Sequence, residues 1–382
     1  MTVPPRLSGS FWPNPIQAKL LAVAFATDQS VEARWRDLDG VKIETLEIGS
    51  LGVLPVVLAR LVAAAVEEDE RLARLQGVQR NVWYRNHLQL HRLPQLVAAL
   101  EDNGIEPLVL GGAPIAARYY EQPGLRPIVQ LELAVDPDDG PHARTVLEQD
   151  GWRRTGGRDR GFALYASEDG AARAFLHEGV PPFLAGPLSL RAVHDDLRAR
   201  ASRLDVAGRA MLVLEPVDDL ILACALGARR IVPQSPQWLI DAHRIVATSE
   251  PAADAVADRA ARFHLVPAVR DTLLYLTRVV EEPEIGPYVV ALSKRPVSRR
   301  DELVHALAGA GSGRFGAPPT TIVAHARATI ATPLPRAIAS LPRAFQASWG
   351  LDQQRHVPIM ALRKALKRLR SSPHPRNTSA SS

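Results

Sequence analysis

Hydrophobic side chains in the first hundred positions recur with the spacing of helices. Residues 16–26 are largely apolar, residues 53–75 are rich in Ala and Leu, and residues 79–100 carry apolar side chains near helical spacing. A period of about 3.6 residues predicts helices for all three stretches. Pro94 lies inside the last one, where a proline kinks or divides a helix. We therefore predict an N-terminal helical region over residues 1–102.

The pattern changes after Asn103-Gly104, a pair typical of a helix end. Short apolar runs and alternating polar and apolar positions follow, as in β-strands. The predicted strands are 105–110, 125–135, 161–166 and 172–177, and the predicted helices between them begin at 113 and 141. This pattern predicts a small αβ core over residues 103–190.

Helical patterning returns after residue 190 and predicts a C-terminal helical region over residues 191–355. Residues 356–382 are expected to hold a basic amphipathic helix, 357–369, followed by a disordered tail. The fold class predicted is α+β, with a small mixed sheet between N- and C-terminal helical segments.

Composition narrows the function classes. The net charge is +5, and much of it sits in residues 363–370, so the body of the chain offers no strongly basic surface for nucleic acid. Cys224 is the only cysteine, which excludes an intramolecular disulfide and a cysteine-rich zinc site. The first residues do not have the pattern of a secretory leader, and the apolar stretch 51–66 is too short for an easy membrane span. We expect a cytoplasmic protein.

One constellation suggests chemistry on phosphates. Gly111-Gly112 follows a predicted strand and precedes a predicted helix, so the backbone there can approach a phosphate closely. On the next predicted strand, Gln130 and Glu132 share a face because alternate residues of a strand point the same way. Two-metal phosphoryl transfer places paired carboxylates at such positions.

These segments resemble a known family. Val109 to Ala116, Gly124-Leu125-Arg126-Pro127 and the strand 130–135 are similar to the uncharacterised nucleotidyltransferase family of bacterial gene clusters, which shows a Leu-Lys-Gly turn, a Leu-Arg-Pro segment and an Asp-x-Asp-Leu-Leu-Val strand. The likeness extends loosely over residues 50–350 and rests more on order and spacing than on identical residues. It implies a nucleotidyltransferase fold that binds an NTP and, if active, transfers a nucleotidyl group to a hydroxyl of a sugar or another small molecule.

The departures from the family pattern concern the metal ligands. The turn Lys of the family falls at Gly111, its two strand Asp residues fall at Gln130 and Glu132, and its third acid falls at Phe175. The resemblance implies Mg²⁺ as the cofactor, with Glu132 as the one remaining carboxylate ligand. Glu132 and Gln130 are the candidate catalytic residues, while Gly111, Gly112 and Arg126 are the candidate nucleotide-binding residues.

Each candidate has a structural alternative. Gly111-Gly112 is either a phosphate cradle or an ordinary turn, Glu132 a metal ligand or a solvated strand residue, and Arg126 a triphosphate contact or a salt-bridge partner. His177 fits a core or rim position. Further candidates are weaker: Asp136, Asp138 and Asp139 as helix caps or displaced metal ligands, His87 and His91 as an exposed helix face or metal pair, and Gly311 to Gly316 as a loop with a dinucleotide-like glycine pattern.

Two functions from different classes follow. The first is a nucleotidyltransferase with an NTP and a small-molecule acceptor. The second is a catalytically inactive relative, a pseudoenzyme that binds a nucleotide, another ligand or a partner protein. A helical scaffold whose αβ core merely resembles the family is a third. The basic helix near the C-terminus either packs its apolar stripe on the body or contacts an anionic membrane or acidic partner.

Overall fold

Helices make up most of the chain before the sheet begins. The computed structural model describes residues 11–66, 69–157, 161–229, 235–280, 285–310, 320–349, 351–361 and 363. The N-terminal elements are α1 (Pro15–Ala24), α2 (Val31–Arg36), the 3₁₀ helix η2 (Ile43–Thr45), α3 (Ile48–Leu51), α4 (Leu54–Ala63) and α5 (Leu72–Glu101). The prediction of one continuous helical stretch over 53–75 is wrong, because the chain leaves α4 through Ala65, whose φ is 53°.

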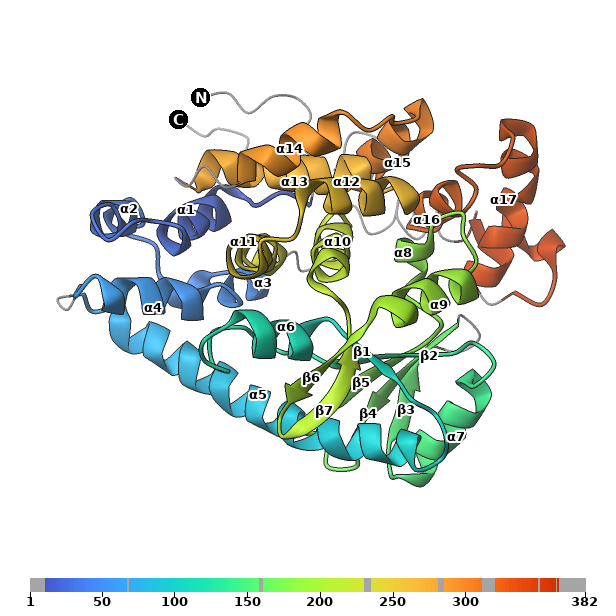
Figure 1. Ribbon diagram of the computed structural model, residues 1–382, viewed down its shortest axis with the longest axis horizontal. Helices are drawn as coiled ribbons and strands as arrows, with labels where there is room; N and C mark the ends of the chain where they lie inside the picture. The colour runs from blue at the N-terminus through green and yellow to red at the C-terminus, as the bar shows by residue number, and fades with distance from the viewer. Residues whose placement is uncertain are drawn as a thin grey trace, which may run out of the picture. The chain divides into compact units, whose positions relative to one another are not determined.

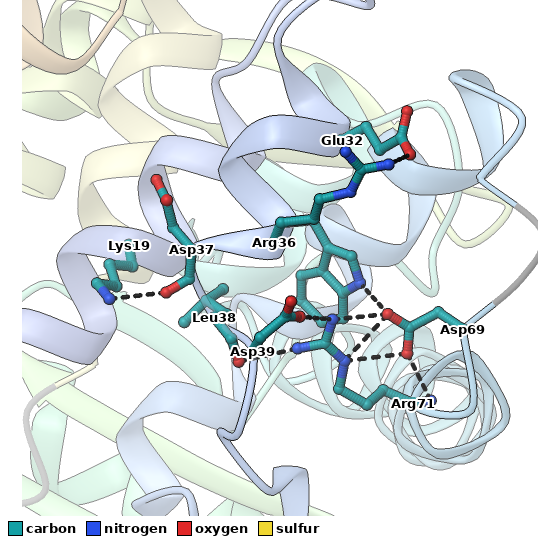
Figure 2. Close-up of polar contacts among 9 residues, drawn as sticks. Lys19, Glu32, Arg36, Asp37, Leu38, Asp39, Asp69 and Arg71 are labelled. Atoms are coloured by element: carbon teal, nitrogen blue, oxygen red, sulfur yellow. Dashed lines mark hydrogen bonds and ion pairs between the residues drawn. The ribbon is translucent and has the colours of Figure 1, made fainter.

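A polar cluster joins α2 to the start of α5 (Figure 2). The Trp35 indole donates to the Asp69 carboxylate at 2.6 Å, and Arg71 donates to Asp69, to Asp39 and to the Leu38 carbonyl. The hydrogen bonds from Arg71 lower the pKa of Asp69 to about 2, with Trp35 contributing in the same direction against the effect of burial. This cluster fixes the beginning of α5.

α5 runs for 30 residues and contains Pro94 without being divided by it. Its inner side chains, among them Leu93, Leu96 and Leu100, are fully buried beneath the sheet. Packing on both sides of the proline thus holds one helix together where the sequence left division open.

The described residues contain a seven-stranded mixed sheet in the order β3-β4-β5-β2-β1-β7-β6 (Figure 1). The strands are β1 (Leu108–Leu110), β2 (Leu131–Val135), β3 (Arg153–Gly156), β4 (Phe162–Ala166), β5 (Arg173–Glu178), β6 (Ser202–Val206) and β7 (Arg209–Val213). β2 runs parallel to β5 and antiparallel to β1, while β1 runs parallel to β7. The predicted α+β class with a small mixed sheet is confirmed.

The sheet has two unlike faces. Leu131, Leu133 and Val135 pack with α5 and with α7 (Gly140–Gln149) in one apolar cluster. Leu108, Leu110 and Ala134 belong to the other cluster, which includes residues of α9 (Leu190–Arg200) and α10 (Pro216–Gly227). The short helices α6 (Gly112–Tyr119) and α8 (Pro182–Ala185) complete this part of the chain. Glu132 shares the face of Ala134, so the candidate site faces α8, α9 and α10.

β2 begins at Leu131, later than the predicted start at 125. The preceding segment is held by side chains of α5 instead of by a strand partner. The Asn86 amide donates to the carbonyl of Arg126 at 2.7 Å and accepts from the Ile128 N–H at 2.8 Å, and the Gln89 amide donates to the Val129 carbonyl at 3.2 Å. These bonds satisfy backbone groups that a ladder would otherwise pair.

β6 and β7 correct the prediction that residues after 190 are helical. They form an antiparallel hairpin through Ala207-Gly208, both with positive φ, as a two-residue hairpin turn requires. β7 then pairs with β1, so the sheet extends beyond the limit at 190 drawn from the pattern. β3 is a further strand that the pattern did not predict.

The remaining helices follow the sheet. They are α11 (Gln237–Ser249), α12 (Ala253–Arg262), α13 (Val266–Val279), α14 (Gly286–Ser293), α15 (Arg299–Gly309) and α16 (Thr320–Ala328). The chain divides into two compact units at residue 331, and the second contains α17 (Leu334–Trp349) and the 3₁₀ helix η4 (Gln354–His356).

Among the helices that the structure describes, none is long and apolar enough to cross a membrane. The basic helix expected over 357–369 is helical at 357–361, and residues 362 and 364–382, with the expected tail, lie outside the described residues. The glycine-rich segment 311–316 also lies outside them.

Candidate functional site

The Gly111-Gly112 turn lies directly beside Glu132. Leu110, the last residue of β1, is opposite Glu132 in the antiparallel pair, so the chain turns over that side chain as it enters α6. Gly111 has φ of 66° and ψ of −129°, a conformation that L side chains rarely adopt. A Cβ placed on Gly111 would lie 3.2 Å from the Glu132 Cδ. Glycine is therefore required here both by backbone conformation and by the approach of the carboxylate.

Glu132 is mostly buried, with 19% of its side chain exposed. The Gln130 amide donates to Glu132 Oε1 at 3.3 Å, and His177 Nε2 lies 3.8 Å from Oε2, too far for a hydrogen bond. Burial raises the pKa of Glu132, but attraction to His177, Gln130 and Arg126 outweighs it and leaves the pKa below its usual value. The carboxylate is thus held in its charged form.

An aromatic stack occupies the neighbouring strand, where the family pattern has its third acid. Phe175 is the Cα partner of Glu132 across the parallel pair. Its ring stacks on His177 at 4.4 Å between centroids and on Phe162 at 5.0 Å. The His177 ring is buried, and neither of its nitrogens has a hydrogen-bond partner in the described part of the chain. The side of β5 that faces Glu132 is therefore lined by aromatic rings.

Arg126 makes a buried ion pair with Asp241 of α11. Its Nε and Nη2 donate to the two Asp241 oxygens at 3.0 and 2.8 Å, and its Nη1 donates to the Pro127 carbonyl. Tyr120 donates to the same carboxylate at 2.7 Å. Although burial lowers the pKa of Arg126, the charge of Asp241 more than compensates and raises it. Of the two roles considered for Arg126, the structure shows the salt bridge.

Arg126 also bounds the glycine turn. A Cβ on Gly112 would lie 2.6 Å from Arg126 Nη1. Arg126 is only 8% exposed, and its guanidinium is held by Asp241 on one side and by the Pro127 carbonyl on the other. The ion pair with Asp241 therefore positions the turn beside Glu132. Asp241 was not singled out from the sequence, because its role depends on a contact between residues 115 positions apart.

Arg229, just after α10, is a further cation near Glu132 that sequence reasoning missed. Its guanidinium carbon lies 4.1 Å from the centroid of the Phe183 ring in α8. Burial lowers its pKa, and the negative charge of Glu132 acts in the opposite direction. Within the described ranges Arg229 forms no ion pair with a carboxylate, so its charge is available to an anion.

Two further carboxylates near the ends of β2 and β5, Asp136 and Glu178, lie away from Glu132. Asp136 follows the far end of β2, roughly 13 Å along the strand from Glu132, and pairs with Arg191 at 3.0 Å. Glu178 lies against Gly140 at the start of α7 and pairs with Arg144. Both carboxylates are therefore held by other cations, away from Glu132.

One group of side chains able to hold a metal ion occurs among the described residues, formed by Asp136, His194 and Asp195. One ligand atom from each lies within 4.8 Å of the others. Glu132 is not part of it. His87 and His91, the i,i+4 pair of α5, are both exposed, and the His87 ring bonds the Trp83 carbonyl at 2.8 Å.

A comparison with protein families agrees with this geometry. The model of a family described as uncharacterised nucleotidyltransferase matches residues 49–281, more than half of the chain. The chain belongs to this family. The match includes the Gly111-Gly112 turn, β2, β5 and the ion pair to α11, and thus every residue of the candidate site. No curated protein matches this nucleotidyltransferase-family chain.

Paired metal ions of the kind implied by the family pattern do not fit this site. Two-metal chemistry requires several carboxylates around the same point. Here the donors near Glu132 are the Gln130 amide and the His177 ring, and Phe175 faces it from β5. An amide is a poor ligand for a hard dication compared with a carboxylate. The nucleotidyltransferase fold is present, whereas the described residues around Glu132 do not supply a donor set for two Mg²⁺ ions.

Proposed function

We propose that this member of the nucleotidyltransferase family binds a nucleoside triphosphate at the Gly111-Gly112 turn and has weak or no transferase activity. The observation that carries the proposal is that Phe175 lies opposite Glu132 on the neighbouring strand. Two-metal catalysis would need a carboxylate at both positions. The phosphate side keeps its glycine turn and two nearby cations, while the metal side keeps a single acid. Binding is therefore better supported than turnover.

The turn supplies the binding surface. Gly111 and Gly112 carry no side chains at the beginning of α6, so the backbone of this buried turn can approach a phosphate closely, as helix N-termini that bind phosphate do. Arg126 holds the turn through Asp241 and contributes positive charge. Arg229 is the cation that we assign to the phosphates, since it forms no ion pair with a carboxylate within the described ranges and the carboxylate whose charge acts on it is Glu132, beside the turn. The stacked rings of Phe162, Phe175 and His177 offer a flat apolar wall beside them.

Catalysis would rest on Glu132 alone. Loss of one preorganised polar group from an active site costs about 10²- to 10³-fold in rate. The family pattern has lost two acids here, at Gln130 and Phe175, so little rate is expected. Glu132 would hold Mg²⁺ only weakly, through water, and we derive no transfer step through such an ion.

The active alternative is transfer of a nucleotidyl group to a hydroxyl of a small molecule or sugar. It is favoured by the ionised Glu132 next to the turn. The other alternative is a pseudoenzyme that acts as a binding or partner module, which the loss of the acids favours. The active alternative predicts both NTP binding and transfer, whereas the pseudoenzyme alternative predicts no transfer, so measuring the two separately distinguishes them.

Calorimetry with ATP, CTP, GTP and UTP, with and without Mg²⁺, tests the proposal. We expect binding of at least one nucleotide with little dependence on Mg²⁺, and loss of at least about tenfold in affinity, roughly 1.4 kcal/mol, in Arg229→Gln. Arg74→Gln is the matched control, because Arg74 is exposed and pairs with Glu44 of η2. Tight binding that requires Mg²⁺ would contradict metal-independent recognition.

Labelled NTPs with candidate acceptors measure transfer directly. We expect no turnover above background in the presence of Mg²⁺ or Mn²⁺. If transfer is observed and Glu132→Gln abolishes it, the active alternative holds. If transfer is observed and Glu132→Gln leaves it unchanged, the site is wrongly placed.

A further inference from the structure

A second polar cluster lies at the opposite end of β2 and is independent of the nucleotide site. It joins Asp136, which directly follows β2, to the first two turns of α9, where His194 and Asp195 are adjacent. One oxygen or nitrogen from each of the three lies within 4.8 Å of the others. His194 and Asp195 follow Asp136 by 58 and 59 positions, yet the ligand atoms of the three residues lie close together.

His194 is the unusual member of this cluster. Its side chain is only 2% exposed, and neither ring nitrogen makes a hydrogen bond within the described residues. Nδ1 is 3.5 Å from Asp195 Oδ1, a distance that a bound ion between the two would explain. Buried polar atoms in folded proteins are nearly always satisfied, so an unsatisfied imidazole facing two carboxylates indicates a missing partner.

Arg191 does not satisfy His194. Its guanidinium pairs with Asp136 at 3.0 Å and with Asp138 at 2.5 Å. The carboxylates of Asp136, Asp138 and Asp195 face this guanidinium, and the other cation that acts on His194, Arg198, is paired with Glu106. The cluster therefore retains excess negative charge beside a buried nitrogen ligand.

We propose that Asp136, His194 and Asp195 form a binding site for a divalent transition-metal ion. One imidazole and two carboxylates suit Zn²⁺, Co²⁺ or Mn²⁺, whereas Mg²⁺ and Ca²⁺ prefer ligand sets made of oxygen alone. The ion is structural, because it ties α9 to the end of β2. It does not take part in the nucleotide chemistry at Glu132, which lies roughly 13 Å away along the strand.

The test is Zn²⁺ binding to the full chain. Calorimetry measures the affinity and the stoichiometry, and the shift of Tm measures the effect on stability. The protein carries His87→Ala and His91→Ala in every arm, which removes the exposed histidine pair of α5 as a competing site. We expect one equivalent of Zn²⁺ to bind and to raise Tm, because an ion that binds only the folded state stabilises it.

Asp195→Asn is the principal variant, since this exposed side chain can be replaced with little effect on folding. Even outer-shell partners of a metal are worth about 10- to 100-fold in affinity, so loss of a direct ligand lowers Zn²⁺ affinity by at least about tenfold. His194→Ala has the same effect if it folds. Asp138→Asn is the matched control, because Asp138 belongs to the cluster but not to the three ligands, and it changes affinity by less than about threefold.

Arg191→Gln separates the site from a simple ion-pair network. The guanidinium and the metal compete for Asp136, so this variant binds Zn²⁺ more tightly than the parent. The proposal is overturned if the parent protein shows no saturable Zn²⁺ binding, if Asp195→Asn binds as tightly as Asp138→Asn, or if Arg191→Gln weakens binding. None of these results depends on nucleotide binding, so this proposal and the proposed function fail separately.

Discussion

Arg126 and Asp241 form a two-point ion pair that links the segment before β2 to helix α11 and is almost completely buried. The pair sets the position of Arg126 Nη1 against Gly112 and so fixes one side of the candidate nucleotide site. It also joins the sheet to the C-terminal helices, because the two residues belong to different parts of the chain. Structure and site therefore depend on the same interaction.

Asp241→Asn should destabilise the protein by about 3–5 kcal/mol, because it leaves the buried Arg126 charge without its counter-charge. The measurement is the free energy of unfolding in urea at neutral pH. Glu32→Gln removes one partner of the exposed Arg36–Glu32 pair of α2 and should cost no more than about 0.5 kcal/mol. Equal effects of the two substitutions would show that the buried pair adds nothing beyond a surface contact.

Gly111→Ala should weaken nucleotide binding and reduce stability. Its Cβ would meet the Glu132 carboxylate at 3.2 Å, and the positive φ adds backbone strain of about 1–3 kcal/mol. Gly104→Ala is the control, since Gly104 also has positive φ but a Cβ there meets nothing within 4 Å. Denaturation and NTP calorimetry on both variants separate strain from contact. If Gly104→Ala lowers NTP affinity as much as Gly111→Ala does, the turn is not the binding element.

Carboxylates at positions 130 and 175 should create a metal requirement. The double variant Gln130→Asp with Phe175→Asp places them just before β2 and opposite Glu132 on β5, the two positions where the resemblance implies acids. We expect Mg²⁺ to tighten NTP binding by at least about tenfold in this variant, which is about 1.4 kcal/mol, and to have little effect on the natural sequence. Calorimetry with and without Mg²⁺ gives the comparison. Gln130→Asp alone should give a smaller gain, and no gain in the double variant would mean that the pocket is shaped wrongly for the ion.

The buried carboxyl of Asp219 predicts a pH dependence of stability. Burial, opposed by the charge of Arg118, raises its pKa to about 7, and in the part of the chain that the structure describes its Oδ1 has no hydrogen-bond partner. A raised pKa means that the folded state binds the proton more tightly than the unfolded state. The contribution of Asp219 is thus fully present below about pH 4 and is lost as pH rises towards 7.

Asp219→Asn should remove this decline, because an amide does not titrate. Unfolding free energies measured from pH 4 to 8 should fall less steeply for Asp219→Asn than for the natural protein. Asp102→Asn, at an exposed position after α5, should leave the profile unchanged. A natural profile that rises from pH 4 to 7 while Asp219→Asn has the same slope would rule out this assignment.

The local pattern of polar and apolar residues predicted most of the helices and strands around the site, but it predicted few of the contacts between them. The short apolar run before Gly111, the alternating pattern that includes Glu132, and the patterns of 161–166 and 172–177 are local signals, and the structure has strands at these places. The start of β2 was placed too early because Asn86 of α5 holds residues 126 and 128 by side-chain bonds that no local pattern reveals. The hairpin of β6 and β7 was missed because its turn places Ala207 at positive φ, where Asn, Asp or Gly is the usual sequence signal.

The candidate residues divide in the same way. The proximity of Gly111 to Glu132 follows from the register of adjacent strands, and it could be predicted from the sequence. The ion pair of Arg126 with Asp241, the nearness of Arg229 to Glu132, and the convergence of Asp136 on His194 join distant segments. Such contacts are decided by tertiary packing, so residue types alone did not identify them.

The parallel pairing of β1 with β7 has a consequence for the smallest unit that can be studied alone. β1 is an entirely buried strand in the middle of the sheet, and the hairpin of β6 and β7 covers its free side. A chain ending at residue 190 would present the apolar residues Leu108, Val109 and Leu110 as an open sheet edge, which is a template for aggregation. A fragment that extends at least to Val213 includes the hairpin of β6 and β7, which covers this edge. The solubility of such a fragment therefore depends on residues far from Gly111 and Glu132.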